Sequence, residues 1–257
     1  MKAGAEPRTS LFGPESGLSD RVDYRLMETP EEKDCIYLMR YKAYLHGGVT
    51  SPSESQRVSD RYDDAPNAWI FGIYVDGELC SSIRLNVVTS ECRISGSTDL
   101  FGDVLHPRLD QGEVFIDPLR LAADPEKTRR FPDLPYLTVR LAYLACEHFN
   151  ADTGLALVRA EHQAFYRRVF MSEVIAEPRS FPGFLPKVSL LASDYRTVRE
   201  KVMTRFPIMR STSVERRMLF QRAGERPSSP RGVVTSFERA FRLPETAGQR
   251  RTRPSGP

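Results

Sequence analysis

The spacing of hydrophobic and polar residues changes along the chain, and each spacing predicts an element. Residues 28–48, ETPEEKDCIYLMRYKAYLHGG, carry helix signals at both ends. Thr29 and Glu32 have the spacing of a capping box, in which each side chain binds the other residue's backbone N–H. Gly47–Gly48 follow as a stop signal. We therefore expect a helix that begins near Thr29 and ends near Gly47–Gly48.

The clearest hairpin signal lies in residues 68–88. Two runs of strand character, AWIFGIYV and ELCSSIRLNVV, flank Asp76–Gly77, a pair typical of a two-residue turn. Because side chains alternate along a strand, the second run divides into two faces. One face carries Leu79, Ile83, Leu85 and Val87, and the other carries Cys80, Ser82, Arg84 and Asn86. We expect the second face, which is small and polar apart from its arginine, to line a cleft.

The rest of the chain alternates strands and helices after a segment predicted as a loop, residues 95–111. Leucines at three- and four-residue steps predict a helix over 133–150, with a buried stripe of Leu134, Leu137, Leu141 and Leu144. Further strands are expected at 155–160, 173–178 and 187–192, and further helices at 162–170, after Asp194 and from Ser213. This order predicts a single α/β domain built on a mixed central sheet.

Composition divides the chain into a body and two terminal segments. Residues 1–20 have the character of a flexible leader and lack the apolar core of a signal peptide. Residues 222–257 contain eight arginines and three glutamates, a net charge of +5, so the rest of the chain carries −2 of the total of +3. This basic tail is rich in Pro, Gly, Ser and Arg and is predicted to be disordered. The folded domain is expected over residues 21–221.

Composition also argues against several classes of protein. No apolar run approaches the roughly 18 residues of a transmembrane helix, so no transmembrane segment is expected. The four cysteines and four histidines show no CxxC pairing and no metal-ligand spacing. We therefore expect free thiols, no metal site and a cytoplasmic location. The tail has two aromatic residues, Phe237 and Phe241, and no recognisable binding motif, so no nucleic-acid partner is expected.

Residues 112–126, GEVFIDPLRLAADPE, combine strand character with features that a regular strand avoids. Pro118 cannot donate a ladder hydrogen bond and usually marks an edge or a bulge. Asp117 and Arg120 are an odd number of residues apart, so a regular strand would point them to opposite faces. One extra residue at a bulge resets this alternation. We expect a bulge at Pro118 that brings Asp117 and Arg120 to one side.

Four segments resemble a known family. MRYKAY, DRYDDAPNAWIFGIYVDGELCSSIRL, DLFGDVLHP and EVFIDPLRLA occur in the order seen in acyl-homoserine-lactone autoinducer synthases and, with a closer resemblance, in N-acyl amino acid synthases. Both belong to the GNAT-like acyltransferase superfamily, and the resemblance covers residues 24–206. It implies a mixed, mostly antiparallel central sheet flanked by helices. One bulged strand would splay from its neighbour, and pantetheine amides would bind the backbone freed there.

The resemblance also implies a cluster of charged site residues, namely Arg40, Asp60, Asp63, Arg84, Asp117 and Arg120. Autoinducer synthases have Glu-x-x-Arg where this chain has Asp117 and Arg120. The shorter carboxylate leaves more room and argues against lactone formation, but not against amide formation. The inferred reaction is attack by the α-amine of an amino acid on a long-chain acyl thioester, which gives an N-acyl amino acid.

The proton of the attacking amine calls for a carboxylate, because an ammonium is not a nucleophile. Asp117 is the first candidate for this base. Asp63 and Asp60 are the alternatives, although we expect them to pair mainly with Arg40 and Arg84 and so to fix the cleft wall.

The remaining charges and polar groups suit binding and stabilisation. Arg84 or Arg120 could hold the substrate carboxylate in a bidentate fork. Backbone N–H groups of the bulge could stabilise the tetrahedral oxyanion. Arg40 and Tyr44 share one helix face at a four-residue spacing and are further candidates for substrate binding.

The segment that follows the bulged strand gives information about the acyl donor. Acetyltransferases of this superfamily hold the CoA pyrophosphate in a glycine-rich turn at a helix N-terminus. The corresponding segment here, AADPEKTRRFPDLPYL, contains no glycine. An acyl carrier protein presents one phosphodiester on an acidic helix, which Lys127, Arg129 and Arg130 could meet. The sequence therefore favours an acyl carrier protein over acyl-CoA, with the acyl-phosphopantetheine thioester as a substrate and no bound cofactor.

Three alternatives stay open at the level of the sequence. The first is an autoinducer synthase that uses S-adenosylmethionine. The second is a non-catalytic scaffold that binds an acyl carrier or a lipid. The third is a protein acetyltransferase whose tail recruits a nucleic-acid-bound target, against which the missing glycine-rich turn counts.

Overall fold

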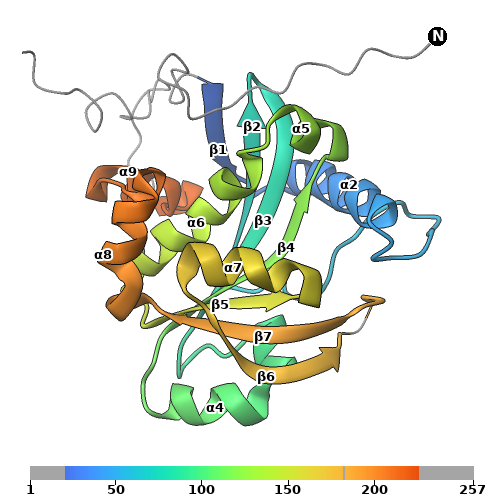
Figure 1. The fold of residues 1–257 in the computed structure, drawn as a ribbon. Helices are drawn as coiled ribbons and strands as arrows, with labels where there is room; N and C mark the ends of the chain where they lie inside the picture. The colour runs from blue at the N-terminus through green and yellow to red at the C-terminus, as the bar shows by residue number, and fades with distance from the viewer. Residues whose placement is uncertain (1–20, 182, 226–257) are drawn as a thin grey trace, which may run out of the picture.

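A computed structural model describes residues 21–181 and 183–225, and Figure 1 shows how their elements are arranged. The predicted leader, residues 1–20, and the predicted tail beyond residue 225 lie outside the described residues. The strands are β1 (Val22–Leu26), β2 (Ala68–Val75), β3 (Glu78–Val88), β4 (Phe115–Ala123), β5 (Thr153–Val158), β6 (Glu173–Ser180) and β7 (Lys187–Asp194). The α-helices are α2 (Pro30–His46), α3 (Gly96–Leu100), α4 (Gly102–Asp110), α5 (Pro125–Arg130), α6 (Leu134–His148), α7 (Gln163–Phe170), α8 (Tyr195–Arg205) and α9 (Ser213–Leu219).

The strands of this part of the chain form one sheet in the order β1-β2-β3-β4-β5-β7-β6. Every neighbouring pair is antiparallel except β4 and β5. These two strands are parallel and pair only through Phe115 with Thr153 and Ile116 with Gly154. Beyond Ile116 they part, and in Figure 1 β5, β7 and β6 run across the direction of β1–β4. The predicted mixed, mostly antiparallel sheet with one splayed strand is confirmed.

Helices cover both faces of this sheet. The predicted capping box at Thr29 and Glu32 begins α2, which packs on one face together with α3 and α4. The predicted leucine stripe of α6 has no exposed surface and packs on the other face with α7 and α8. Within the described ranges, no helix combines the length and apolar character needed to cross a bilayer.

The β2–β3 hairpin has the predicted turn, but the first residues of β3 are shifted in register against β2. Asp76 and Gly77 both have positive φ, at +52° and +81°, as a two-residue type I′ turn requires. The pairing shifts by one residue beyond Ile73, so Cys80 packs in the core on the α6 face, whereas Leu79 packs on the α2 face. The faces predicted for Leu79 and Cys80 are therefore wrong, because a bulge reverses the alternation there.

The segment 95–111 was predicted as a loop, and this prediction is wrong. It forms α3 and α4, and Phe101, Leu105 and Leu109 are fully buried against Phe115. These three residues are four apart, so a helical pattern was present in the sequence. Pro107 inside α4 and Gly102 at its start obscured that pattern.

The predicted bulge of β4 exists, but not at the proline. Pro118 pairs in regular register with Leu85, whereas β4 gains one residue between Leu119 and Ala122 relative to β3. Arg120 lies in this extra segment with φ at +53°. The missing N–H of Pro118 is tolerated because β5 has already parted from β4 there. The expected location at Pro118 is corrected to Arg120.

Candidate active site

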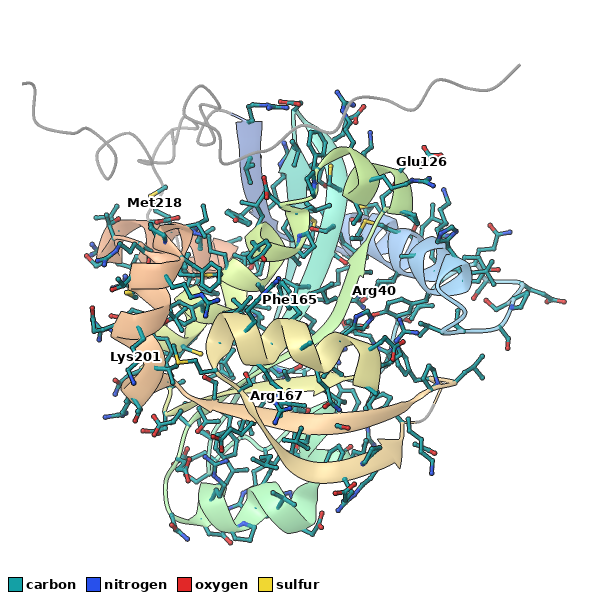
Figure 2. All side chains as sticks on the ribbon, viewed as in Figure 1. Arg40, Glu126, Phe165, Arg167, Lys201 and Met218 are labelled. Atoms are coloured by element: carbon teal, nitrogen blue, oxygen red, sulfur yellow. The ribbon has the colours of Figure 1, made fainter. Side chains whose placement is uncertain are left out.

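Asp63 and two arginines form a fully buried ionic cluster. Arg40 of α2 donates from Nη1 to both carboxylate oxygens of Asp63, at 2.8 and 3.0 Å. Arg84 of β3 donates from its own Nη1 to Oδ1 of Asp63 at 2.9 Å. None of the three side chains has exposed surface, and Arg40 lies beside the sheet in Figure 2. A buried charge costs less when it is paired, and these pairs link α2, the loop after it and β3.

Asp60 extends this cluster towards the surface. Its Oδ1 accepts a hydrogen bond from Nη1 of Arg84. Its Oδ2 accepts one from Nε of Arg120 at 2.8 Å and forms an ion pair with Nη2 of Arg120 at 2.7 Å. Burial alone would raise the pKa of Asp60, but the charges of Arg84 and Arg120 hold that pKa below its ordinary value. Asp60 is 15% exposed and Arg120 10%, so this pair is the reachable end of an otherwise buried network.

Asp117 lies deeper, where β4 meets α3. Its Oδ1 accepts from Oγ of Ser97 at 2.8 Å, and its Oδ2 accepts from the backbone N–H of Ser97 at 3.3 Å. Burial raises the pKa of Asp117, although the hydrogen bonds from Ser97 act in the opposite direction. Asp117 has no exposed surface and lines none of the three cavities described below. It can therefore act on a substrate only through an intervening group.

A groove follows the edge of β4 that the splay frees. It has an open volume of about 380 Å³ and is lined by Pro118–Ala123 on one side and by Val158, Arg159 and His162 on the other. Tyr44 of α2 lines it too and donates from its hydroxyl to the backbone oxygen of Leu121 at 3.3 Å. The groove thus runs along the gap between β4 and β5.

A second hollow, here called the charged pocket, adjoins the groove. It is lined by Asp60, Arg61, Tyr62, Gly96, Asp99, Leu100, Arg120 and Phe181. Arg120 and Phe181 line the groove as well, so the two hollows meet at these residues. The guanidinium of Arg120 stands 5.7 Å from the centre of the Phe181 ring. The junction therefore joins a positive charge, a carboxylate and an aromatic wall.

A third, apolar cavity opens from the groove into the core between α6, α7 and the sheet. Pro118, Leu121 and Tyr166 line both spaces. Its other walls include Ile83, Val139, Tyr143, Cys146, Gly154 and Phe170. With an open volume of about 50 Å³ it is narrow, yet its lining is what a hydrocarbon chain requires.

The predicted docking residues lie on α5, which begins just past the end of β4. Lys127 pairs with Glu78, Arg129 is exposed, and Arg130 stacks over Phe131 at 5.1 Å. The N-terminus of α5 is already capped, because the carboxylate of Asp124 accepts the N–H groups of residues 126 and 127 at 2.8 and 3.0 Å. This helix end therefore presents a negative charge where a pyrophosphate would need free N–H groups.

A splayed sheet with a groove along the opening is the arrangement expected of the predicted GNAT-like fold, and several solved structures share the fold of this chain. The chain is similar to FeeM, an N-acyl amino acid synthase from uncultured soil microbes, with a TM-score of 0.60 and 15% identity over 72% of this chain and 96% of that one. It is similar to the acyl-homoserine-lactone synthase LasI, with a TM-score of 0.51 and 13% identity over 66% of this chain and 89% of LasI. It is also similar to the CoA-dependent acyl-homoserine-lactone synthase BjaI, with a TM-score of 0.51 and 11% identity over 72% and 88% of the two chains. At these identities the likeness shows a common fold.

The sequence itself identifies the family. The model of the N-acyl amino acid synthase FeeM matches residues 35–194, which is more than half of the chain. The chain belongs to the FeeM N-acyl amino acid synthase family, and it is an N-acyltransferase. A search of the curated proteins gives no match.

Sequence reasoning brought together Arg40, Asp60, Asp63, Arg84 and Arg120, which the structure joins in one network. It missed other cavity walls: Arg61, Gly96, Asp99, Arg159, Tyr166 and Phe181. Arg61 could have been found, since it stands between two aspartates already selected. Phe181 comes from the β6–β7 connection, and no local pattern ties it to β4.

Proposed function

We propose that this protein transfers a long-chain acyl group from the thioester of an acyl carrier protein to the α-amine of an amino acid. The observation that carries this proposal is the meeting of the groove and the charged pocket at Arg120 and Phe181. The extended thioester would lie in the groove, and the small zwitterionic amino acid would lie in the charged pocket. Their reacting atoms would meet at the bulge of β4.

The donor arm would lie in the groove with its acyl chain in the apolar cavity. Past Ile116, the β4 edge has no β5 partner, so its backbone can bind pantetheine amides as a strand neighbour would. Pro118, Leu121 and Tyr166 line both the groove and the apolar cavity, which gives the acyl chain a continuous path into the core.

An acyl carrier protein suits the entrance better than CoA does. The N-terminus of α5 carries Asp124 in place of free N–H groups, which disfavours a pyrophosphate. Arg129 is exposed on the same helix, and Lys127 and Arg130 add positive charge that an acidic partner can meet.

The reaction needs one proton removed and one oxyanion stabilised. The nitrogen of the amine attacks the thioester carbon, the C–N bond forms, the C–S bond breaks, and the thiol leaves with a proton. Asp60 lines the charged pocket as a carboxylate of low pKa, so we assign it to attract and orient the ammonium and pass its proton to water. Backbone N–H groups of the bulge at Arg120 would stabilise the oxyanion.

The other predicted catalytic residues receive positioning parts in this proposal. Asp117 would hold α3, and with it a wall of the charged pocket, through Ser97. Asp63, with Arg40 and Arg84, would fix Asp60 in place.

Product analysis tests the proposal. Purified protein is incubated with an acyl-loaded carrier protein and a mixture of amino acids, and the extract is examined by mass spectrometry. We expect masses equal to an amino acid plus the acyl group minus water. Acyl-homoserine lactone and methylthioadenosine, formed only when S-adenosylmethionine is added, would instead assign the autoinducer reaction. No product from folded protein with either acceptor would contradict both assignments.

A further inference from the structure

The charged pocket contains two ion pairs at different depths. The Asp60–Arg120 pair forms its inner wall, and its two side chains are 15% and 10% exposed. The second pair, Arg61 with Asp99, lies at the rim, with side chains that are 75% and 44% exposed. Tyr62 also donates its hydroxyl to Asp99, so this carboxylate bridges the 60–63 loop and α3.

The depth of each pair fixes the orientation of an amino acid in this pocket. The attacking nitrogen must reach the thioester, and among the described residues Arg120 and Phe181 are the walls that the groove and the charged pocket share. The ammonium therefore belongs at the inner wall, beside the Asp60 carboxylate. The α-carboxylate, attached to the same carbon, then points away from Asp60 and towards the rim.

The rim supplies a cation for that carboxylate. Arg40 and Arg84 are fully buried and bound to Asp63, and Arg120 directs Nε and Nη2 to Asp60. Arg61 has most of its side chain exposed. Within the described residues its guanidinium stands 5.0 Å from the centre of the Tyr62 ring, and its hydrogen bonds use Nη2 alone. A guanidinium can bind a carboxylate through two parallel hydrogen bonds, and an exposed ion pair is weak enough to be exchanged.

We propose that Arg61 binds the α-carboxylate of the acceptor amino acid, with Asp99 as the competing anion that holds Arg61 over the empty pocket. This inference rests on the proposed function, because it assigns the acceptor to the charged pocket. Arg61 then selects amino acids over amines of the same side chain, and Asp99 weakens the binding that Arg61 provides.

The experiment compares two acceptors that differ only in the carboxylate: an amino acid and the amine made by its decarboxylation. kcat and KM for each are measured with the wild type and with Arg61→Ala, Asp99→Asn and Arg57→Ala. Arg57 is the matched control, because it lies on the same connecting segment and pairs with Asp34, yet it lines none of the described cavities.

We expect Arg61→Ala to raise KM for the amino acid about 10- to 100-fold, the effect of losing a charge-assisted pair, with kcat little changed. The amine should be unaffected, so the preference for the amino acid disappears. Asp99→Asn should lower KM for the amino acid, because the competing anion is removed, and Arg57→Ala should change KM for neither acceptor.

If Arg61 and Asp99 only latch the loop to α3, both substitutions will lower activity on both acceptors alike, and the proposal is overturned. A wild type that acylates the amino acid and the amine equally well also overturns it, while leaving N-acyl transfer intact. A wild type that acylates neither contradicts the proposed function itself and removes the basis of this inference.

Discussion

Arg120 pairs with Asp60 through two guanidinium nitrogens, from a backbone held in the left-handed region. Its Nε and Nη2 lie 2.8 and 2.7 Å from Oδ2 of Asp60, and its φ is +53°. The bulge of β4 produces both features, because the extra residue turns the Arg120 side chain towards the face that carries Arg84. A strained residue at the junction of two cavities is typical of a functional site.

The strain at Arg120 predicts an unusual order of stability among its variants. Both Arg120→Ala and Arg120→Gly lose the ion pair, but only glycine adopts positive φ without steric cost. We expect Arg120→Gly to be more stable than Arg120→Ala by about 1 kcal/mol in urea unfolding. Arg210, with φ at −70°, is the control, and there alanine should be at least as stable as glycine. An alanine variant more stable than the glycine variant at position 120 would contradict the left-handed bulge.

Asp117→Asn separates a positioning residue from a base. Asparagine keeps an oxygen that can accept the Ser97 hydroxyl but has no charge and cannot take a proton. If Asp117 is a positioning residue, the substitution should lower kcat less than about tenfold and leave the pH profile unaltered. If Asp117 is the general base, kcat should fall by roughly 10²- to 10⁴-fold. Steady-state kinetics over a range of pH decides between them, and a loss of the larger size with a changed profile would restore Asp117 as the base.

Asp117 and Asp60 should contribute to the free energy of unfolding with opposite dependence on pH. The raised pKa of Asp117 gives a contribution that is complete below the unfolded value, about 3.9, and is lost as pH rises through the folded pKa. The lowered pKa of Asp60 gives a contribution that is present above the unfolded value and is lost as pH falls through the folded pKa.

Relative to wild type, Asp117→Asn should therefore become more stable as pH rises from about 4 to neutral. Asp60→Asn should become relatively less stable as pH rises from acid towards neutral. Urea unfolding at a series of pH values measures both differences. Differences that stay constant with pH for both variants would show that neither carboxyl titrates as described.

The apolar cavity predicts control of acyl chain length by Gly154. A Cβ added there would meet Sγ of Cys146 at 3.5 Å, an ordinary contact, so small side chains fit without strain. Gly154→Val should fill part of the cavity and shift the products to shorter chains. Burial of one methylene contributes ~0.8 kcal/mol, so the preference for a longer acyl chain over a shorter one should fall about fourfold for each methylene excluded. Gly154→Ala should shift them less. Competition between acyl chains of different length, read by mass spectrometry, tests this, and an unchanged profile in both variants would place the chain elsewhere.

Charge reversal on α5 tests the donor. Arg129→Glu with Arg130→Glu should raise KM for an acyl carrier protein about tenfold or more, through slower association, and leave KM for a short acyl-pantetheine thioester unchanged. Arg196→Glu on α8, 60% exposed, is the control for a change in surface charge elsewhere. Equal effects on the two donors would count against docking on α5.

Local patterns in the sequence were enough for much of the fold. The caps at Thr29, the Asp76–Gly77 turn and the leucine stripe of α6 each depend on residues close together in the chain, and each was predicted. The register of β3 at Cys80 and the position of the bulge at Arg120 were not, because both depend on pairing between strands. Local pattern also misled at α4, where Pro107 inside a helix reads as a loop signal.

Some features of the candidate site could likewise be predicted from the sequence, and others could not. The charged network follows from a family resemblance carried by short motifs. The burial of Asp117, and the placement of Phe181 between two cavities, depend on tertiary packing that spacing does not encode.

The central claim is that amide formation takes place at the junction where Asp60 faces an incoming amine. The most direct test measures the rate of N-acyl amino acid formation from an acyl carrier protein donor with wild type, Asp60→Asn and the control Asp34→Asn, each checked for folding by circular dichroism. Asp34, like Asp60, binds an arginine, but it lies away from the cavities described here. We predict a loss of at least about 100-fold for Asp60→Asn and none for Asp34→Asn. Full activity in folded Asp60→Asn protein would contradict the assignment of the reaction to this junction.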